Sequence, residues 1–200
     1  MSGTFPSSPA PASIEVSSIE PTLISVTSNL TRQARSRGGQ RWSFRVSFAP
    51  MTRAQFDPIF AFSVKQRGQY ETFTWVPTTI GTSRGESSET PVVDGALSKG
   101  VTTATIKSLT ASTSNIMRSG DFFKFTGHSK VYMCTADMSS DSGGAATLDF
   151  VPKLTTAVAD EDALTISSVP FTVAFTSDIQ TGSTNATSYY AYGIDLIEVP

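Results

Sequence analysis

The residues best suited to chemistry are the only histidine, His128, and an acid pair, Asp137 and Asp141. A hydrolase triad needs a base such as histidine beside a nucleophile. His128 stands in Thr-Gly-His-Ser between two expected strands, where a tight turn accounts for it. The acids lie in DMSSDSGG, which lacks the ligand spacing of an EF-hand loop and ends in ordinary hairpin residues. The sequence therefore predicts turns at both places, and neither an active site nor a calcium site.

Cys134 is the single cysteine and lies in the apolar run KVYMCTA. It has no intrachain partner for a disulfide and is expected to be a small buried hydrophobe. No glycine-rich phosphate loop follows a strand and opens a helix, and no pair of carboxylates stands out for acid–base work. We therefore expect a protein that is not an enzyme and that has no cofactor or metal site.

Aromatic residues near the end of the chain offer one binding alternative. Tyr189, Tyr190 and Tyr192 could stack on sugar rings or bases from a sheet surface. Packing within a strand explains most of them, so we favour a structural role.

The charge of the chain is uneven although its net value is only −2. Residues 1–70 carry eight Lys or Arg against three acids, and residues 71–200 carry seven against fourteen. The candidate subunit-interface residues, all from the basic segment, are Arg35, Arg37, Arg41, Arg45 and Arg53. Arginine pairs with carboxylates as well as with phosphates, so acids of a neighbouring copy or domain, such as the run 160–162, are suitable partners. A pI of about 5.4 argues against a dedicated nucleic-acid protein.

These side chains must be held by a framework that reads as mainly β. Charged residues make up 16% of the chain, Phe occurs 13 times, and Ser, Thr and Gly separate the apolar runs. Strands are expected at 13–18, 23–28, 41–48 and 69–77. Segment 41–48 alternates Trp42, Phe44, Val46 and Phe48 on one face with Arg41, Ser43, Arg45 and Ser47 on the other. It is therefore expected to be half-buried.

A helix near 53–67 follows this strand. Thr52 and Gln55 form a candidate capping box, and apolar residues recur at helical spacing (Phe56, Ile59, Phe60 and Val64) up to Gly68. Pro58 leaves a second reading open, in which the helix begins with Asp57 as N-cap and Pro58 as its first residue.

Beyond the helix the pattern predicts a second β region. Residues 81–100 are rich in Gly and Pro and read as a surface linker. Five short strands are expected near 101–109, 121–126, 130–136, 145–151 and 163–167, which suggests a small barrel, OB-like or SH3-like. Two long strands, in 169–178 and 189–199, could pair with the first unit. The fold class is thus a β-sandwich or split-barrel unit with one helix, plus a small inserted β-barrel.

This reading divides the chain into three parts: an extended N-terminal arm (1–12), a ring-forming β unit with the helix (13–80 plus 168–200), and the inserted barrel (90–167). No apolar run approaches the ~18 to 20 residues that span a bilayer, and the N-terminus lacks the features of a signal peptide. We expect no membrane partner and an intracellular product.

Three segments carry a resemblance to a known family: GGQRWSFRVSFAPMTRAQFDPIFAFSVKQRGQYETFTWVP, SGDFFKFTGHSKVYMCTADMSSDSGGAATLDFVPKL and YYAYGIDLIEVP. Together they resemble the distal tail proteins of tailed bacteriophages. The resemblance implies a β unit with a helix that assembles as a hexameric ring, and a peripheral β-barrel domain. Here the barrel would be an insertion, which departs from the common two-domain order.

The resemblance also implies function and partners. The ring would join the tail tube protein to the hub or tip protein at the baseplate, so the protein would be found in the virion, at the tail tip, after assembly in the bacterial cytoplasm. In such a ring Arg41 and Arg45 are expected to be available to a neighbouring copy or to the adjoining tube, and arm 1–12 is long enough to lie across an adjacent copy. The alternatives are a host-surface carbohydrate-recognition module and another minor tail or adaptor protein.

Overall fold

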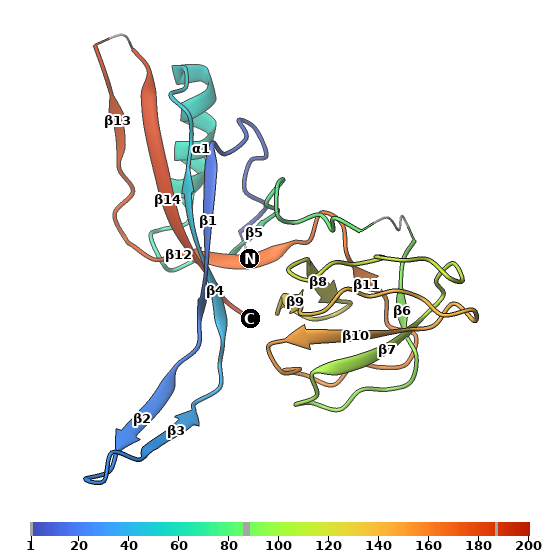
Figure 1. Ribbon diagram of the computed structural model, residues 1–200. Coiled ribbons are helices and arrows are strands. Elements are labelled where there is room, and N and C mark those ends of the chain that lie inside the picture. The colour runs from blue at the N-terminus through green and yellow to red at the C-terminus, as the bar shows by residue number, and fades with distance from the viewer. Residues whose placement is uncertain (1, 86–88, 187) are drawn as a thin grey trace. The chain divides into compact units, whose positions relative to one another are not determined.

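The computed structural model describes residues 2–85, 89–186 and 188–200, and its β content confirms the expected mainly β class (Figure 1). The chain forms two compact units. Unit 1 comprises Met1–Phe73 and Val173–Val199, and unit 2 comprises Thr74–Thr172 with Pro200. The chain therefore leaves unit 1 within one strand and returns to it within another.

The first sheet carries its strands in the order β1 (Ser13–Ile19), β4 (Arg41–Ser47), β14 (Tyr190–Glu198), β12 (Phe171–Phe175) and β5 (Phe73–Trp75). A further strand, β13 (Gly182–Thr184), pairs with residues 190–192 of β14, whereas β12 pairs with residues 196–198. The segment around β13 is polar and lies between the two expected strands 169–178 and 189–199, so no strand was predicted there. It forms a hairpin with β14 that stands at one end of the sheet (Figure 1).

Strand β4 confirms the predicted alternation. Trp42, Phe44 and Val46 are buried, while Arg41 and Arg45 are exposed on the other face. Both neighbours of β4 are antiparallel, with Val46 opposite Ile14 of β1 and Ile194 of β14. A single alternating strand thus sets which face of the whole sheet is apolar.

The helix α1 (Arg53–Lys65) covers the apolar face of this sheet (Figure 1). Its start agrees with the first of the two readings: Thr52 is the N-cap, and its backbone N–H donates to Gln55 Oε1 at 3.0 Å. Pro58 lies inside the helix, so the reading with Asp57 as N-cap was wrong.

One core residue of the helix was predicted wrongly. The buried positions of α1 are Phe56, Ile59 and Ser63, whereas Val64 is 56% exposed. The Ser63 hydroxyl donates to the Ile59 carbonyl at 2.9 Å, which lets a polar side chain occupy the buried face. Val64 is thereby turned towards solvent at the C-terminal end of the helix.

The N-terminal arm packs on its own unit. Phe5 is 5% exposed, and its ring lies 5.5 Å from Phe62 and 6.0 Å from Phe73 between centroids. The Ser2 backbone N–H donates to the Thr72 carbonyl at 2.9 Å. Because Phe5 fills part of the core, residues 2–5 are held by the subunit that carries them, and the idea that the whole arm lies across an adjacent copy does not fit these contacts.

A separate two-stranded sheet, the β2–β3 hairpin, joins β1 to β4. It consists of β2 (Thr22–Val26) and β3 (Arg32–Ser36), and all ten strand residues are exposed. Figure 1 shows it projecting beyond the sheet, at the end away from β13. The sequence analysis missed β3 because RQARS has no apolar alternation.

Unit 2 contains the predicted small barrel, built from six strands instead of five. They follow the order β11 (Leu164–Thr165), β8 (Phe122–Phe125), β9 (Tyr132–Cys134), β10 (Ala146–Val151), β7 (Thr103–Lys107) and β6 (Val92–Val93). The edge strands almost meet: Val93 N–H donates to the Asp162 carbonyl at 3.0 Å, and Leu164 N–H to the Pro91 carbonyl at 2.8 Å. The sheet is therefore a nearly closed barrel.

Strand β6 corrects the prediction of a linker at 81–100. Val93 is fully buried in the barrel core, and Leu97 packs against that core and bridges to Val158. The Gly, Ser and Pro residues of this segment hid a strand of only two residues, which is too short to show a period.

Candidate functional site

His128 lies in the turn between β8 and β9 and belongs to a hydrogen-bonded group inside unit 2. Its Nδ1 is 3.3 Å from the Tyr132 hydroxyl, which is 3.0 Å from Thr155 Oγ1 and accepts the Thr155 backbone N–H at 3.2 Å. Tyr132 is fully buried. Burial lowers the pKa of His128 below its usual value. The group satisfies the polar end of a core tyrosine, in keeping with the structural reading of this histidine.

Cys134 is buried, as predicted, and its thiol donates to the Ala136 carbonyl at 2.8 Å. Burial raises the pKa of this thiol to about 11. The neutral thiol is therefore favoured at neutral pH, and a thiolate nucleophile is not available.

Of the two acids near Cys134, Asp141 holds its own turn, as expected, whereas Asp137 binds the backbone of a segment 18 residues earlier in the chain. Asp141 Oδ1 accepts the backbone N–H groups of Gly143 at 2.8 Å and Ala145 at 3.0 Å, and Asp137 Oδ1 accepts that of Ser119 at 2.8 Å. Hydrogen bonds from Ala145 and Gly143 lower the pKa of Asp141. Across the described ranges, no group of three His, Cys, Asp or Glu side chains is placed to hold a metal ion.

The three tyrosines divide between packing and exposure. Tyr192 is 4% exposed, and Tyr190 stacks on Phe56 with a centroid distance of 4.7 Å. Gly182 of β13 lies against the same Phe56 ring, so closely that a Cβ atom at this position would overlap it. Tyr189, which is 48% exposed, is the one large open ring of this set.

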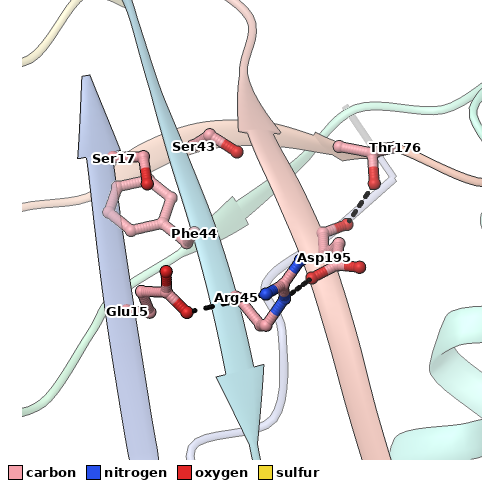
Figure 2. A pocket seen from close by; sticks show the side chains of 7 residues that line it. All are labelled: Glu15, Ser17, Ser43, Phe44, Arg45, Thr176 and Asp195. Carbon is pink, nitrogen blue, oxygen red and sulfur yellow. Dashed lines mark hydrogen bonds and ion pairs between the residues drawn. The ribbon is translucent and has the colours of Figure 1, made fainter. Parts of the chain in front are cut away.

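The polar face of the first sheet carries a row of three charged side chains, drawn in Figure 2. Glu15, Arg45 and Asp195 are cross-strand neighbours on β1, β4 and β14. Arg45 Nε lies 3.2 Å from Asp195 Oδ1, and Arg45 Nη1 lies 3.7 Å from Glu15 Oε2. Ser17, Ser43, Phe44 and Thr176 complete the lining of a shallow hollow of about 210 Å³ around them. Arg45 is thus already paired within its own subunit, which its predicted role towards a neighbour did not foresee.

The five arginines proposed as interface residues do not form one site. Arg53 pairs with Asp57 on the helix at 3.3 Å, and Arg45 belongs to the row on the sheet. Arg35 lies on β3, Arg37 directly follows it, and Arg41 begins β4. Within the part of the chain that the structure describes, no carboxylate lies within 4.0 Å of the guanidinium of Arg35, Arg37 or Arg41. These three form the open part of the set.

Two exposed apolar surfaces of unit 1 were missed by the sequence analysis. One is on the β2–β3 hairpin, where Leu23, Ile24, Val26 and Leu30 are between 54% and 84% exposed. The other, here called the helix corner, consists of Val64 (56%), Tyr70 (74%) and Ile179 (77%). For the surface on the β2–β3 hairpin, the sequence offered one signal: the apolar run LISV, next to a segment without apolar alternation. Nothing in the sequence pointed to the second.

No membrane-spanning helix is found: within the described residues, none is long and apolar enough to cross a bilayer.

Comparison with known protein families gives a match for the second unit. Residues 81–169 match the family model of the B domain of distal tail protein pb9. No curated protein matches the chain. The matched segment contains all six barrel strands, so the resemblance to phage distal tail proteins is confirmed, and it supports a structural role in a phage tail.

Proposed function

We propose that this protein is a structural virion protein of a bacteriophage tail, in which about six copies form a ring that joins the tail tube to the hub or tip at the baseplate. The observation that carries the proposal is the match of residues 81–169 to a distal tail protein domain. The absence of a catalytic constellation in the sequence agrees with a structural role.

Unit 1 has the features that ring formation requires. Strand β1 is an outer strand of its sheet, and β13 and β5 are outer strands on the opposite side. Outer strands offer backbone N–H and C=O groups to a further strand. When two different edges of each copy meet, the contact is head-to-tail, and it closes into a ring if the rotation between copies fits. This supports residues 13–80 with 168–200 as the ring-forming part.

The barrel, proposed as an insertion at 90–167, would then be a spacer or an attachment platform outside the ring. The competing function, recognition of host carbohydrate, draws little support from it. Every Phe and Tyr of residues 90–167 is buried: Phe122, Phe123, Phe125, Tyr132 and Phe150 are at most 6% exposed. Sugar rings stack on open aromatic faces, and this barrel uses its rings to fill its core.

Light scattering combined with electron microscopy of the purified full chain tests the proposal. A closed ring with a mass near six copies is the expected result. The variant Arg41→Glu should weaken assembly without unfolding the subunit, because Arg41 is exposed and outside the ion pairs of its own chain. The matched control is Lys99→Glu, an exposed charge reversal in unit 2. A chain that stays monomeric alone and also fails to assemble when mixed with purified tail tubes would contradict a connector role.

A further inference from the structure

We propose that the β2–β3 hairpin of one copy docks on the helix corner of a second copy, and that this contact links neighbours in the ring. The inference rests on the proposed ring, and it names the two surfaces that meet. It starts from an imbalance in unit 1, whose core is well filled while seven large apolar side chains in these two surfaces stay open to water.

Among the described residues, no further strand pairs with the β2–β3 hairpin. A two-stranded ribbon of this kind is marginally stable in water without a packing surface. Ile24 faces Ala34 across the strands, and Val26 lies one pair further along the same face, opposite Arg32. Leu23, opposite Arg35, points to the other face. One face thus joins Ile24 and Val26 to Arg32, and the other joins Leu23 to Arg35, as in a surface that is apolar at its centre and charged at its rim.

The hairpin tip strengthens this reading. Leu30 is 84% exposed and has a φ of 63°, in the left-handed region that favours glycine or asparagine. A bulky apolar side chain is an unfavourable choice there for a free turn. Strain of this type gathers at binding sites. The tip therefore has the character of an anchor that a second surface covers.

Of the surfaces of unit 1, the helix corner fits best as the docking site for the hairpin of a second copy. Val64 ends the exposed side of α1, and Tyr70 follows the turn after it. Ile179 is placed beside them because its neighbour Asp178 accepts the Gln69 backbone N–H at 3.1 Å. The corner offers three apolar side chains at one place, comparable in kind to those on the hairpin.

Charge supports the pairing. The hairpin region holds Arg32, Arg35 and Arg37, for which the described residues provide no ion pair. At the corner, Glu71 and Asp178 form no ion pair within the described residues either, and the carbonyl end of α1 adds negative potential. Lys65 and Arg67 also lie here. Arg67 stacks over the Tyr70 ring at 5.8 Å, and among the described residues neither Lys65 nor Arg67 forms an ion pair with the two carboxylates, which therefore remain available to an incoming arginine.

The hairpin and the corner are different surfaces of one subunit, so their contact is head-to-tail. A head-to-tail contact predicts complementation between two broken variants. The hairpin variant is Leu23→Ser with Ile24→Thr and Val26→Thr, and the corner variant is Tyr70→Ser with Ile179→Ser. All five residues are exposed, so both variants should fold with an unchanged melting temperature within about 3 °C.

Sedimentation of the full chain then gives distinct outcomes. The wild type should form the ring and each variant alone should be monomeric. Their equimolar mixture should form dimers and stop there, because one intact hairpin can meet one intact corner. Val151→Thr, an exposed apolar change in unit 2, is the control that should keep the ring. A ring formed by either variant, or a mixture that stays monomeric, would overturn this inference and leave the proposed ring standing.

Two further measurements cover the remaining cases. Leu30→Gly should keep or raise the melting temperature, since glycine accepts a positive φ, yet should weaken assembly at least tenfold. If the wild type is monomeric, chains with Leu30→Cys are mixed with chains carrying Ile179→Cys and oxidised. If the mixed disulfide makes up clearly more than half of all cross-linked dimers, which is the share that random pairing gives, the contact is supported although the free chain does not close a ring by itself. A mixed share of half or less, or no cross-linking, overturns the contact, and the proposed function is then decided separately by assembly on purified tail tubes.

Discussion

Arg84 Nε lies 3.0 Å from Asp121 Oδ1, and the pair joins the segment that precedes β6 to the residue just before β8. The Asp121 side chain is 2% exposed. It also accepts hydrogen bonds from Ser83 Oγ at 2.7 Å and from the backbone N–H groups of Arg84 and Arg118 at 3.1 and 2.9 Å. One carboxylate thus fixes two loops to the barrel.

We expect Asp121→Asn to destabilise unit 2 by about 2 kcal/mol, because a buried amide cannot replace both acceptor oxygens of the carboxylate. Arg84→Ala should cost no more than about 1 kcal/mol, since Arg84 is 64% exposed. Urea unfolding of the full chain followed by far-UV circular dichroism measures both. An Asn variant as stable as the wild type would contradict this account of the loops.

The same carboxylate predicts a pH dependence. Burial raises the pKa of Asp121, but the hydrogen bonds from Arg118, Ser83 and Arg84 outweigh it, so the pKa lies below its usual value of 3.8. A lowered folded-state pKa adds stability above the unfolded pKa, and this stability is lost as the pH falls through the folded value. The melting temperature of unit 2 should therefore decrease as the pH is lowered below about 4, and the decrease should be less steep in the variant Asp121→Asn.

The capping box of α1 should contribute measurably to the free energy of unfolding of unit 1. Gln55→Ala removes the acceptor of the Thr52 N–H, and we expect a loss of about 1 kcal/mol. Thermal unfolding by circular dichroism measures it. Arg53→Ala is a suitable control, because it loses only an exposed ion pair with Asp57 and should change the stability by less than about 0.5 kcal/mol.

Gly182→Ala should destabilise unit 1 by about 1 to 3 kcal/mol, since the new methyl group would overlap the Phe56 ring. In a Phe56→Leu background the same substitution should cost at least 1 kcal/mol less, because the smaller side chain leaves room. A double-mutant cycle from urea unfolding gives this difference. Additive effects would mean that the two residues do not press on each other.

Cys134 should be unreactive in the folded protein. Because its pKa is raised to about 11 and its side chain is buried, a thiol reagent at about pH 8 should label it at least 100-fold more slowly than it labels the unfolded chain in guanidinium. Rapid labelling of the native state would contradict the burial. The slow reaction would also allow the Leu30→Cys and Ile179→Cys cross-linking to proceed without interference.

Much of the framework could be predicted from local patterns. The alternation in 41–48 and the Thr52–Gln55 pair each concern residues within one strand or one helical turn, and both were confirmed. Short or irregular strands could not be predicted in this way, because β6 has only two residues and β3 has no apolar alternation. Their pairing is decided by strands far along the chain, which leaves no periodic signal in the segments themselves.

The five candidate interface residues were predicted from residue type alone, and for them the sequence was least informative. Five arginines looked alike in the chain, but the structure separates them by their neighbours. Arg45 meets Asp195, 150 positions away, while Arg35 and Arg37 meet no carboxylate among the described residues. The exposed apolar side chains could not be predicted from the sequence either. Val64, for example, has the spacing of a core residue, yet its side chain is turned towards solvent.

The sequence by itself determined the mainly β class, the presence of one helix after strand 41–48, the small barrel and the resemblance to distal tail proteins, but it left two starts open for the helix. The β class, the helix and the barrel follow from side-chain period, capping and turn chemistry, which act between near neighbours, whereas the likeness to distal tail proteins is a resemblance of whole segments. Only the tertiary structure decided that Phe5 belongs to the core of unit 1, that Arg45 is paired, and that the β2–β3 hairpin and the helix corner stay open. Burial and ion pairing depend on which distant strands become neighbours, and that is set by the packing of the whole unit.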